Sequence, residues 1–250
     1  MIEATLGAFL NAVGILIGGI IGLLRPKPLS QQTQAFFKVL LGVFTVYVGL
    51  RLVWLSTGGT FFQVLKQLLI TSLALMLGTV LGKLLRLQTL SNHLGQRAKK
   101  LLEANRPNDP QRFSNGMNTC AILFCAAPLG ILGAIHDALP AVDGSVRYFH
   151  PMIVKGLMDG LAMMGFVMLF GVGAILSALP VYAVFGTITL LTHIYAEPFL
   201  RSHYLIDSVN CVGGLIICTI SVVIFEIRRV QLADYLPALA IAPLITWLWK

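Results

Sequence analysis

The stretch KGLMDGLAMMGF, residues 155–166, opens a long apolar run and carries Lys155 and Asp159 one helical turn apart. In the whole chain of 250 residues, 57% are hydrophobic and 11% are charged, and the mean hydropathy is +0.84. A soluble domain has about 25% charged residues, so this chain has too little polar surface for a globule in water. We therefore expect an integral membrane protein that keeps two charges within a spanning helix.

The apolar residues fall into separate segments of membrane-spanning length. A spanning helix needs roughly 17–25 mostly apolar residues, and a membrane barrel would instead alternate polar and apolar residues. The sequence therefore predicts an all-α polytopic fold in a single domain over residues 1–250. The eight expected spans are 4–24, 36–55, 64–84, 117–137, 152–174, 179–196, 207–226 and 233–249.

A weak internal similarity relates spans 1–3 to spans 6–8. Gly42 lies near the start of an aliphatic run in the second span, as Gly213 and Gly214 do in the seventh. An offset of five spans would invert the topology, and inverted repeats are typical of transporters with a site near the repeat interface. Chance matching between apolar helices explains the similarity equally well, so both interpretations stay open.

Lys and Arg are distributed unequally between the two sets of loops. Cytoplasmic loops carry the excess, so the richer set is expected in the cytoplasm and both termini outside. The net charge of +8 follows from these loops and forms no basic patch of the kind that binds nucleic acid. The twelve residues of the richer set are Arg25, Lys27, Lys38, Lys83, Arg86, Arg97, Lys99, Lys100, Arg106, Arg112, Arg228 and Arg229; the six others are Arg51, Lys66, Arg147, Lys155, Arg201 and Lys250.

The one long loop, residues 86–115, has leucines at helical spacing and the cations Arg97, Lys99 and Lys100 on other faces. A basic amphipathic helix of this kind can lie on the inner leaflet and bind anionic lipid. A connector helix that packs on the bundle fits the same pattern.

The candidate site begins with Lys155 and Asp159, which share a helix face because they are four residues apart. A carboxylate inside a membrane is costly unless it is paired, hydrated or protonated, and it usually faces the bundle interior or a wet cavity. An internal ion pair near the rim and a binding site for a solute or ion are both consistent with this spacing.

Further polar residues lie in other spans. Pro128, with Gly130 and Gly133 behind it, predicts either a broken fourth span or an ordinary kink. A divalent-metal vestibule from the outer histidines and carboxylates is an alternative, but no Cys/His ligand spacing supports it, so no metal or cofactor is expected. The remaining candidates for substrate or ion binding are His136 and Asp137 at the end of span 4, Asp207 at the start of span 7, and Asn11 in span 1.

Glycines four residues apart recur in three spans, as Gly14, Gly18 and Gly22, as Gly78 and Gly82, and as Gly156 and Gly160. Such faces allow helices to approach closely, and they would also permit a homodimer.

Six stretches occur in an order that resembles the YqgA-like family of bacterial inner-membrane proteins, a domain of unknown function. They are GAFLNAVGILIGGIIG near the start, GILGAIHDAL, KGLMDGLA, SALP (177–180), VNCVGGLII and LPALAIAP (236–243). The resemblance implies a multi-spanning protein of the bacterial inner (cytoplasmic) membrane, and Asp137, Lys155 and Asp159 match its motif positions. The family pattern differs at two places, with Gln where His136 stands and Glu near Asp207.

These observations favour a secondary transporter or channel for a small solute or ion, with an outward-facing polar site around Asp137, Lys155 and Asp159. The alternative is a membrane scaffold or assembly factor that acts through the basic loop. An intramembrane enzyme acting on lipid, with His136 and Asp137 as acid and base, lacks a nucleophile beside them. The chain also has no HExxH or GxSxG motif, so no enzymatic activity is expected.

Overall fold

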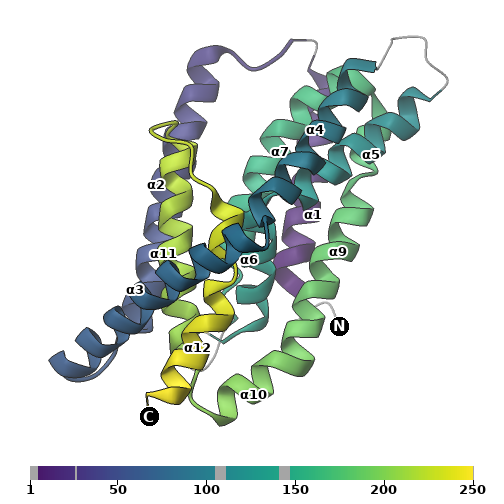
Figure 1. Cartoon of the computed structure of the whole chain (residues 1–250). Helices are drawn as coiled ribbons and strands as arrows, with labels where there is room; N and C mark the ends of the chain where they lie inside the picture. Colours follow the sequence, from purple (N-terminus) through teal and green to yellow (C-terminus); the bar gives the residue numbers. More distant parts are fainter. Residues whose placement is uncertain (1–4, 26, 105–110, 141–146, 250) are drawn as a thin grey trace.

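The computed structural model describes residues 5–25, 27–104, 111–140 and 147–249. These residues form helices joined by turns, with one isolated bridge between Pro140 and Arg147 and no strand. Figure 1 shows the long helices running roughly alongside one another, with α3 crossing them at a steep angle. The chain is a polytopic helical membrane protein, as its composition predicts.

Six helices of the described residues are long and apolar enough to cross a membrane. Five of them are α1 (Leu6–Leu24), α2 (Gln31–Leu55), α3 (Phe61–Leu84), α7 (His150–Phe170) and α11 (Ile206–Ile224). The sixth is the run Val172–Ser202, made of α8 (Val172–Ile175), α9 (Ala178–Leu191), the π-helical turn η2 (Thr192–Ala196) and α10 (Glu197–Ser202). These six coincide with predicted spans 1, 2, 3, 5, 7 and 6.

The fourth and eighth predicted spans have a different form. The fourth is a pair of helices, α5 (Arg112–Cys125) and α6 (Pro128–Ala138), bent by 65°. The eighth falls on the shorter apolar segment Leu232–Leu248, which contains the 3-10 turn η3 (Leu232–Tyr235) and α12 (Ala238–Leu248). Pro237 stands between these two elements and is the N-cap of α12, so that helix begins only at Ala238.

Close glycine contacts hold the pairs of spans together. A Cβ on Gly18 of α1 would lie 2.0 Å from the carbonyl oxygen of Gly160 on α7, and one on Gly49 of α2 would lie 2.6 Å from that of Gly214 on α11. On α3, a Cβ on Gly82 would lie 2.1 Å from the Asp234 carbonyl oxygen. The prediction that glycine faces pack helices is confirmed, and because these contacts lie within one chain, they provide no surface for the predicted homodimer.

Large apolar side chains cover much of the outside of the bundle. Trp54 on α2 is 81% exposed, Phe62 on α3 is 79% exposed and Met76 on α3 is 67% exposed. Such surfaces are stable only against lipid, since monomeric soluble proteins rarely expose large contiguous apolar patches. The predicted contact with a lipid bilayer follows from them.

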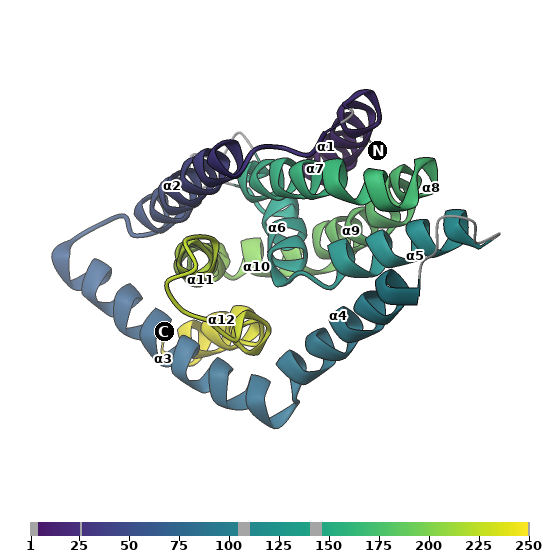
Figure 2. The same cartoon turned by 90° about the horizontal axis from the view of Figure 1, so that it is seen from above.

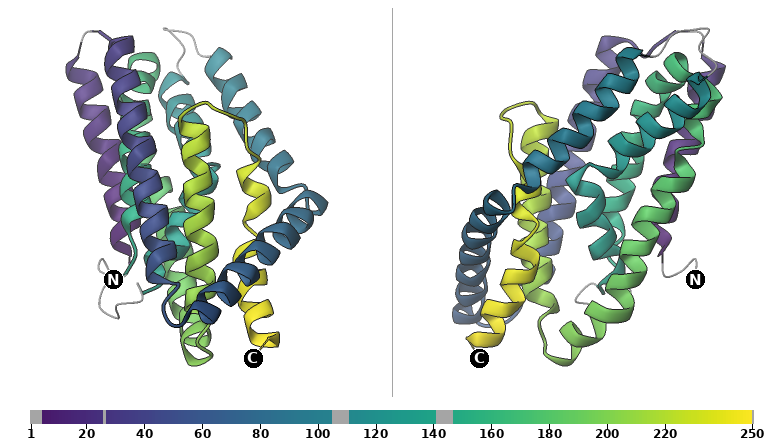
Figure 3. Two further views of the ribbon diagram at one scale, coloured as in Figure 1. Left: turned by 90° about the vertical axis from the view of Figure 1, so that its left-hand side faces the viewer. Right: turned by 45° about the vertical axis from the view of Figure 1, so that its right-hand side comes forward.

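The described ends of the chain lie toward the same end of the bundle (Figure 1). The start of α2 and the turn that leaves α11 lie at the opposite end (Figure 3), where the richer basic loops are expected. An even number of crossings would produce this arrangement. Which end faces the cytoplasm stays a prediction, and two of the cations it rests on, Arg106 and Lys250, lie outside the described residues.

The predicted amphipathic helix is present as α4 (Leu87–Ala104). It meets α3 at a sharp turn (Figure 2) and packs against α5 and η3, with Ala98 fully buried. Ser91 donates a hydrogen bond to the Ala126 carbonyl at 3.2 Å. These contacts are those expected of a connector helix that packs on the bundle. Residues 105–110 of the loop lie outside the described residues.

Candidate functional site

The centre of the candidate site is an ion pair on α7. Lys155 donates from its Nζ to the Oδ2 of Asp159, one helical turn further along. Lys155 is 2% exposed and Asp159 is 6% exposed, so both charges have lost almost all contact with solvent. Removing two charges from water costs several kcal/mol each after relaxation, which only a close partner offsets.

Aromatic rings from two other helices enclose the Lys155 ammonium. Its Nζ lies 5.6 Å from the ring centre of Phe124 on α5 and 5.5 Å from that of Phe185 on α9. Both distances allow a cation–π attraction. On the α6 side, a Cβ on Gly130 would lie 2.1 Å from the Phe185 ring and 3.0 Å from the Lys155 Cε, so glycine leaves room for the ring that packs on the lysine.

Asn11 of α1 completes the surroundings of the pair. Its side chain approaches the Asp159 carboxylate, and its backbone lies against Gly156 of α7. Asn11 is fully buried, yet neither its amide nitrogen nor its oxygen completes a hydrogen bond within the described residues. A buried amide without partners costs free energy, so this side chain has unused donors and an unused acceptor next to a charge.

The break between α5 and α6 lies beside the same pair. Phe124 is in the last turn of α5 and Gly130 in the first turn of α6, and both contact Lys155. Pro128 stands in the first turn of α6, where its missing N–H is tolerated, and the bend of 65° is that of a broken span or of a re-entrant loop. Helix ends at such a break carry free carbonyl and N–H groups, the Ala126 carbonyl being taken by Ser91.

Asp137 has a different set of contacts. Both of its carboxylate oxygens accept the backbone N–H of Gly7 at 3.0 Å, and Oδ2 also accepts that of Ala8 at 3.4 Å. These N–H groups belong to the first turn of α1, so Asp137 caps that helix and neutralises its positive end. Among the described residues, the structure gives no direct contact between Asp137 and the pair on α7.

His136 is buried between α6 and α11. Its Nδ1 lies 2.9 Å from the Leu132 carbonyl oxygen, which accepts a hydrogen bond from this nitrogen, so Nδ1 carries the proton. A Cβ on Gly213 would lie 2.0 Å from the His136 Nε2, which makes no hydrogen bond within the described residues. His136 thus faces α11, whereas Lys155 faces α5 and α9. Asp207, also predicted as a site residue, is exposed in the first turn of α11.

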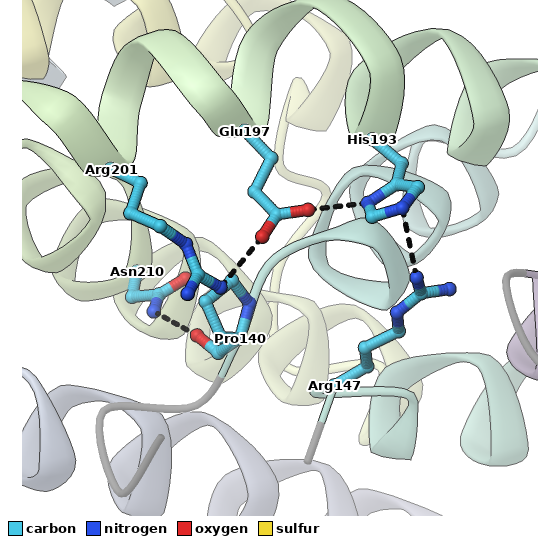
Figure 4. A network of polar contacts seen from close by, with 6 residues as sticks. All are labelled: Pro140, Arg147, His193, Glu197, Arg201 and Asn210. Carbon is cyan, nitrogen blue, oxygen red and sulfur yellow. Dashed lines mark hydrogen bonds and ion pairs between the residues drawn. The ribbon is translucent and has the colours of Figure 1, made fainter. Parts of the chain in front are cut away.

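A second polar network joins η2 and α10 to Arg147 (Figure 4). Glu197 is 9% exposed and accepts from the Arg201 guanidinium at 2.7 Å. Arg147 donates to His193 Nε2 at 3.1 Å, so the His193 proton lies on Nδ1, which contacts Glu197. The described residues include no group of three or more His, Cys, Asp or Glu side chains that could hold a metal.

Sequence reasoning treated Arg147 and Arg201 only as topology signals. The spacing of four residues from His193 through Glu197 to Arg201 predicts one helix face and could have identified that half of the network. Arg147 comes from a distant segment, and no sequence pattern places it there.

The chain was compared with known proteins. The model of the family described as "Protein of unknown function (DUF554)" matches residues 6–247, and the chain therefore belongs to this family. It is 26% identical over 239 residues to "Uncharacterized membrane protein YdfK" of Bacillus subtilis (strain 168), an alignment that covers 96% of this chain and 94% of that protein. It is also 23% identical over 245 residues to "Uncharacterized protein YqgA" of Escherichia coli (strain K12), covering 98% and 97% of the two chains. No solved structure matches it. The family resemblance drawn from the six sequence stretches is confirmed.

Proposed function

We propose that this member of the family is a secondary transporter or channel for a small solute or ion, in the bacterial inner membrane, with the Lys155–Asp159 pair at its centre. The observation that carries the proposal is the position of this buried pair beside a broken span. Discontinuous helices near the middle of the membrane typically provide backbone groups for substrates and coupling ions in transporters. Ionisable residues inside a membrane likewise mark ion and substrate pathways.

Packing alone does not account for the pair. Replacing a buried ion pair with apolar residues of similar volume is often neutral or stabilising, so its presence suggests another use. A cation or a proton that reached Asp159 would compete with the Lys155 ammonium for the carboxylate. Asn11 would then supply the acceptor and donors that are unused in the described residues. This exchange of partners would give the site two states, with and without the ion.

A cleft runs along α7 from the end of the bundle that carries Lys27 and Lys38, which is the end expected to face the cytoplasm. It has a volume of about 440 Å³ and lies between α2 and α7, from Lys27 and Lys38 at one end to Met158 at the other. Its wall on α7 runs from Met158 to Met168, about 15 Å of helix at 1.5 Å per residue. The cleft reaches Met158, which is next to Asp159 in the chain. Neither Lys155 nor Asp159 lines the cleft, so the arrangement fits an occluded state.

Asp137 and His136 have supporting roles in this proposal. Asp137 couples the outer end of α6 to α1, so a movement of the broken span would move the helix that carries Asn11. His136 faces Gly213 across the contact between α6 and α11. Asp207 lies exposed at the start of α11, at the end of the bundle opposite to Lys27 and Lys38, and is not among the residues that line this cleft.

The test is transport by purified protein in sealed liposomes, recorded as solid-supported-membrane currents with a panel of cations, organic acids and amino acids. A solute-dependent current that Asp159→Asn abolishes supports the proposal. Glu103→Gln is the matched control, because Glu103 is an exposed carboxylate on α4, far from α7 in sequence, and its loss should leave the current unchanged. A current that survives Asp159→Asn would contradict the role of the pair.

The second candidate is a membrane scaffold that acts through α4. It is favoured by the exposure of Arg97, Lys99 and Lys100, which present a basic surface next to the bundle. If the triple change of these residues to Gln abolishes the cellular phenotype of the protein while Asp159→Asn does not, the scaffold function is the correct one.

A further inference from the structure

A second cavity lies away from the ion pair on α7. It has a volume of about 780 Å³ and is enclosed by α3, the start of α4 and the connection from α11 to η3. This size falls within the range of about 300–1,000 Å³ typical of small-ligand sites. Its charged lining residues are Lys83, Arg228 and Arg229, and no carboxylate lines it among the described residues. Three positive charges therefore share one concave space.

The walls of the cavity are fixed by reciprocal hydrogen bonds. Asp234 accepts the backbone N–H of Gln88 at 2.9 Å and so caps the start of α4. In return, the Gln88 Oε1 accepts the backbone N–H of Ala233 at 3.2 Å. Gly82 permits the close approach of η3 to α3, since a Cβ there would collide with the Asp234 carbonyl oxygen. Three segments are thus tied together around the cavity.

The acidic side chain of Asp234 on η3 is already used in another contact. Asp234 is 3% exposed, its carboxylate is used by α4, and it is not among the lining residues. No described carboxylate forms an ion pair with Lys83, Arg228 or Arg229, whereas Lys38 nearby is paired with Glu226 at 2.7 Å. Like charges brought together in this way repel, and a bound anion would relieve the repulsion.

Neutral donors accompany the cations. Asn92 accepts from the Gln88 side-chain amide at 3.0 Å, which uses its oxygen and leaves its own amide N–H groups for a ligand. Guanidinium groups and amides are the donors that recognise phosphoryl oxygens, and two adjacent arginines permit bidentate contacts. The donor set therefore suits an anion with several acceptor oxygens, such as a phosphate group, and not a cation.

We propose that this cavity binds a phosphoryl anion, either the phosphate of an anionic phospholipid headgroup or a free phosphate compound. Exposed apolar residues are chain neighbours of its lining residues Thr79, Lys83 and Arg228, with Val80 66% exposed, Leu84 77% exposed and Ile227 73% exposed. Acyl chains could lie on these side chains while the headgroup occupies the cavity. The proposal does not depend on transport, because none of its residues belongs to the Lys155–Asp159 site.

The experiment uses the purified full chain in a neutral detergent. Binding is measured by native mass spectrometry and by the shift of the thermal unfolding midpoint. One arm adds phosphatidylglycerol, with phosphatidylcholine as the neutral lipid. The other adds inorganic phosphate or glycerol 3-phosphate at constant ionic strength, with chloride as the reference anion. Binding in the first arm alone identifies the lipid headgroup, and binding in the second identifies a free phosphate compound.

The variant is Lys83→Gln/Arg228→Gln/Arg229→Gln, and the control is Arg25→Gln/Lys27→Gln/Lys66→Gln, which removes the same charge from exposed residues outside the cavity and outside α4. We expect the cavity variant to bind at least about tenfold more weakly, since charge-assisted hydrogen bonds are among the strong ones, and the control to stay within about twofold of the original chain. Equal weakening of both, or no binding in either arm, would overturn the proposal. If the triple variant does not fold, the single variants Arg228→Gln and Arg229→Gln are used instead, and each should weaken binding about threefold. If neither single variant weakens binding, the proposal is wrong.

Discussion

Asp137, near the end of α6, holds the first turn of α1 by accepting the backbone N–H of Gly7 with both carboxylate oxygens at 3.0 Å. The two residues are 130 positions apart in the chain and are both buried. Gly7 is required there, because a Cβ would lie 2.7 Å from the Asp137 carboxyl carbon. The second half of the broken span is therefore fixed to the helix that also carries Asn11.

The first prediction concerns this cap. Asp137→Ala leaves the Gly7 and Ala8 N–H groups buried without an acceptor, so we expect a loss of about 1–3 kcal/mol in the free energy of unfolding. Asp137→Asn keeps one acceptor oxygen and should lose less. Thermal unfolding of the purified protein checks both changes. Asp207→Asn is the stability control, because Asp207 is exposed and its change should fall within about 0.5 kcal/mol. An unaltered melting curve for Asp137→Ala would show that the cap is dispensable.

The second prediction separates stability from function at the ion pair. Asp159→Asn or Lys155→Met alone leaves one buried group without its partner and should destabilise the protein by about 3–5 kcal/mol. The double variant Lys155→Met/Asp159→Asn removes both charges and should recover most of that loss. If the pair has the proposed role, the double variant is folded and has no solute-dependent current. A double variant that is stable and still transports would reduce the pair to a structural element.

Much of the fold could be predicted from the sequence, because a spanning helix is encoded locally in the length of its apolar run. The spans near 4–24 and 207–226 are within a few residues of α1 and α11. The i,i+4 spacing likewise indicated the contact between Lys155 and Asp159. Periodicity also indicated a helix over the start of the 86–115 loop, although not its packing on α5.

The features that the sequence did not predict depend on contacts between segments that are distant in the chain. No spacing rule joins Asp137 to Gly7, so Asp137 was expected beside Lys155 instead of at the start of α1. Pro128 predicted a kink or a break but could not choose between them, because the choice depends on whether Ser91 and neighbouring groups satisfy the freed backbone. The predicted inverted repeat has no test in these contacts and stays a prediction.

The third prediction tests the contact between α1 and α7. Gly18→Ala places a methyl group 2.0 Å from the Gly160 carbonyl oxygen, and backbone on both sides prevents relaxation. We expect a loss of about 1–3 kcal/mol or more in the free energy of unfolding, as overpacking of a tight core typically gives. Gly165→Ala on α7 is the matched control, since its Cβ would meet nothing within 4 Å. Alanine is the better helix former by about 1 kcal/mol, so this control should be neutral or slightly stabilising. Equal effects of the two changes would mean that α1 and α7 are not in this contact.

The fourth prediction concerns Asn11, whose buried amide has no hydrogen-bond partner within the described residues. Asn11→Leu keeps the number and branching of the side-chain heavy atoms and removes an unsatisfied polar group, so the free energy of unfolding should be unchanged or should increase. If Asn11 serves only packing, the transport current is unchanged as well. If it contacts the ion or solute as proposed, the concentration giving half-maximal current rises, by about tenfold for a lost hydrogen bond to a charged group. A purely structural role of Asn11 would not give a protein that is more stable and binds solute more weakly. Measuring the free energy of unfolding and the transport current of this one variant therefore decides between packing and solute binding.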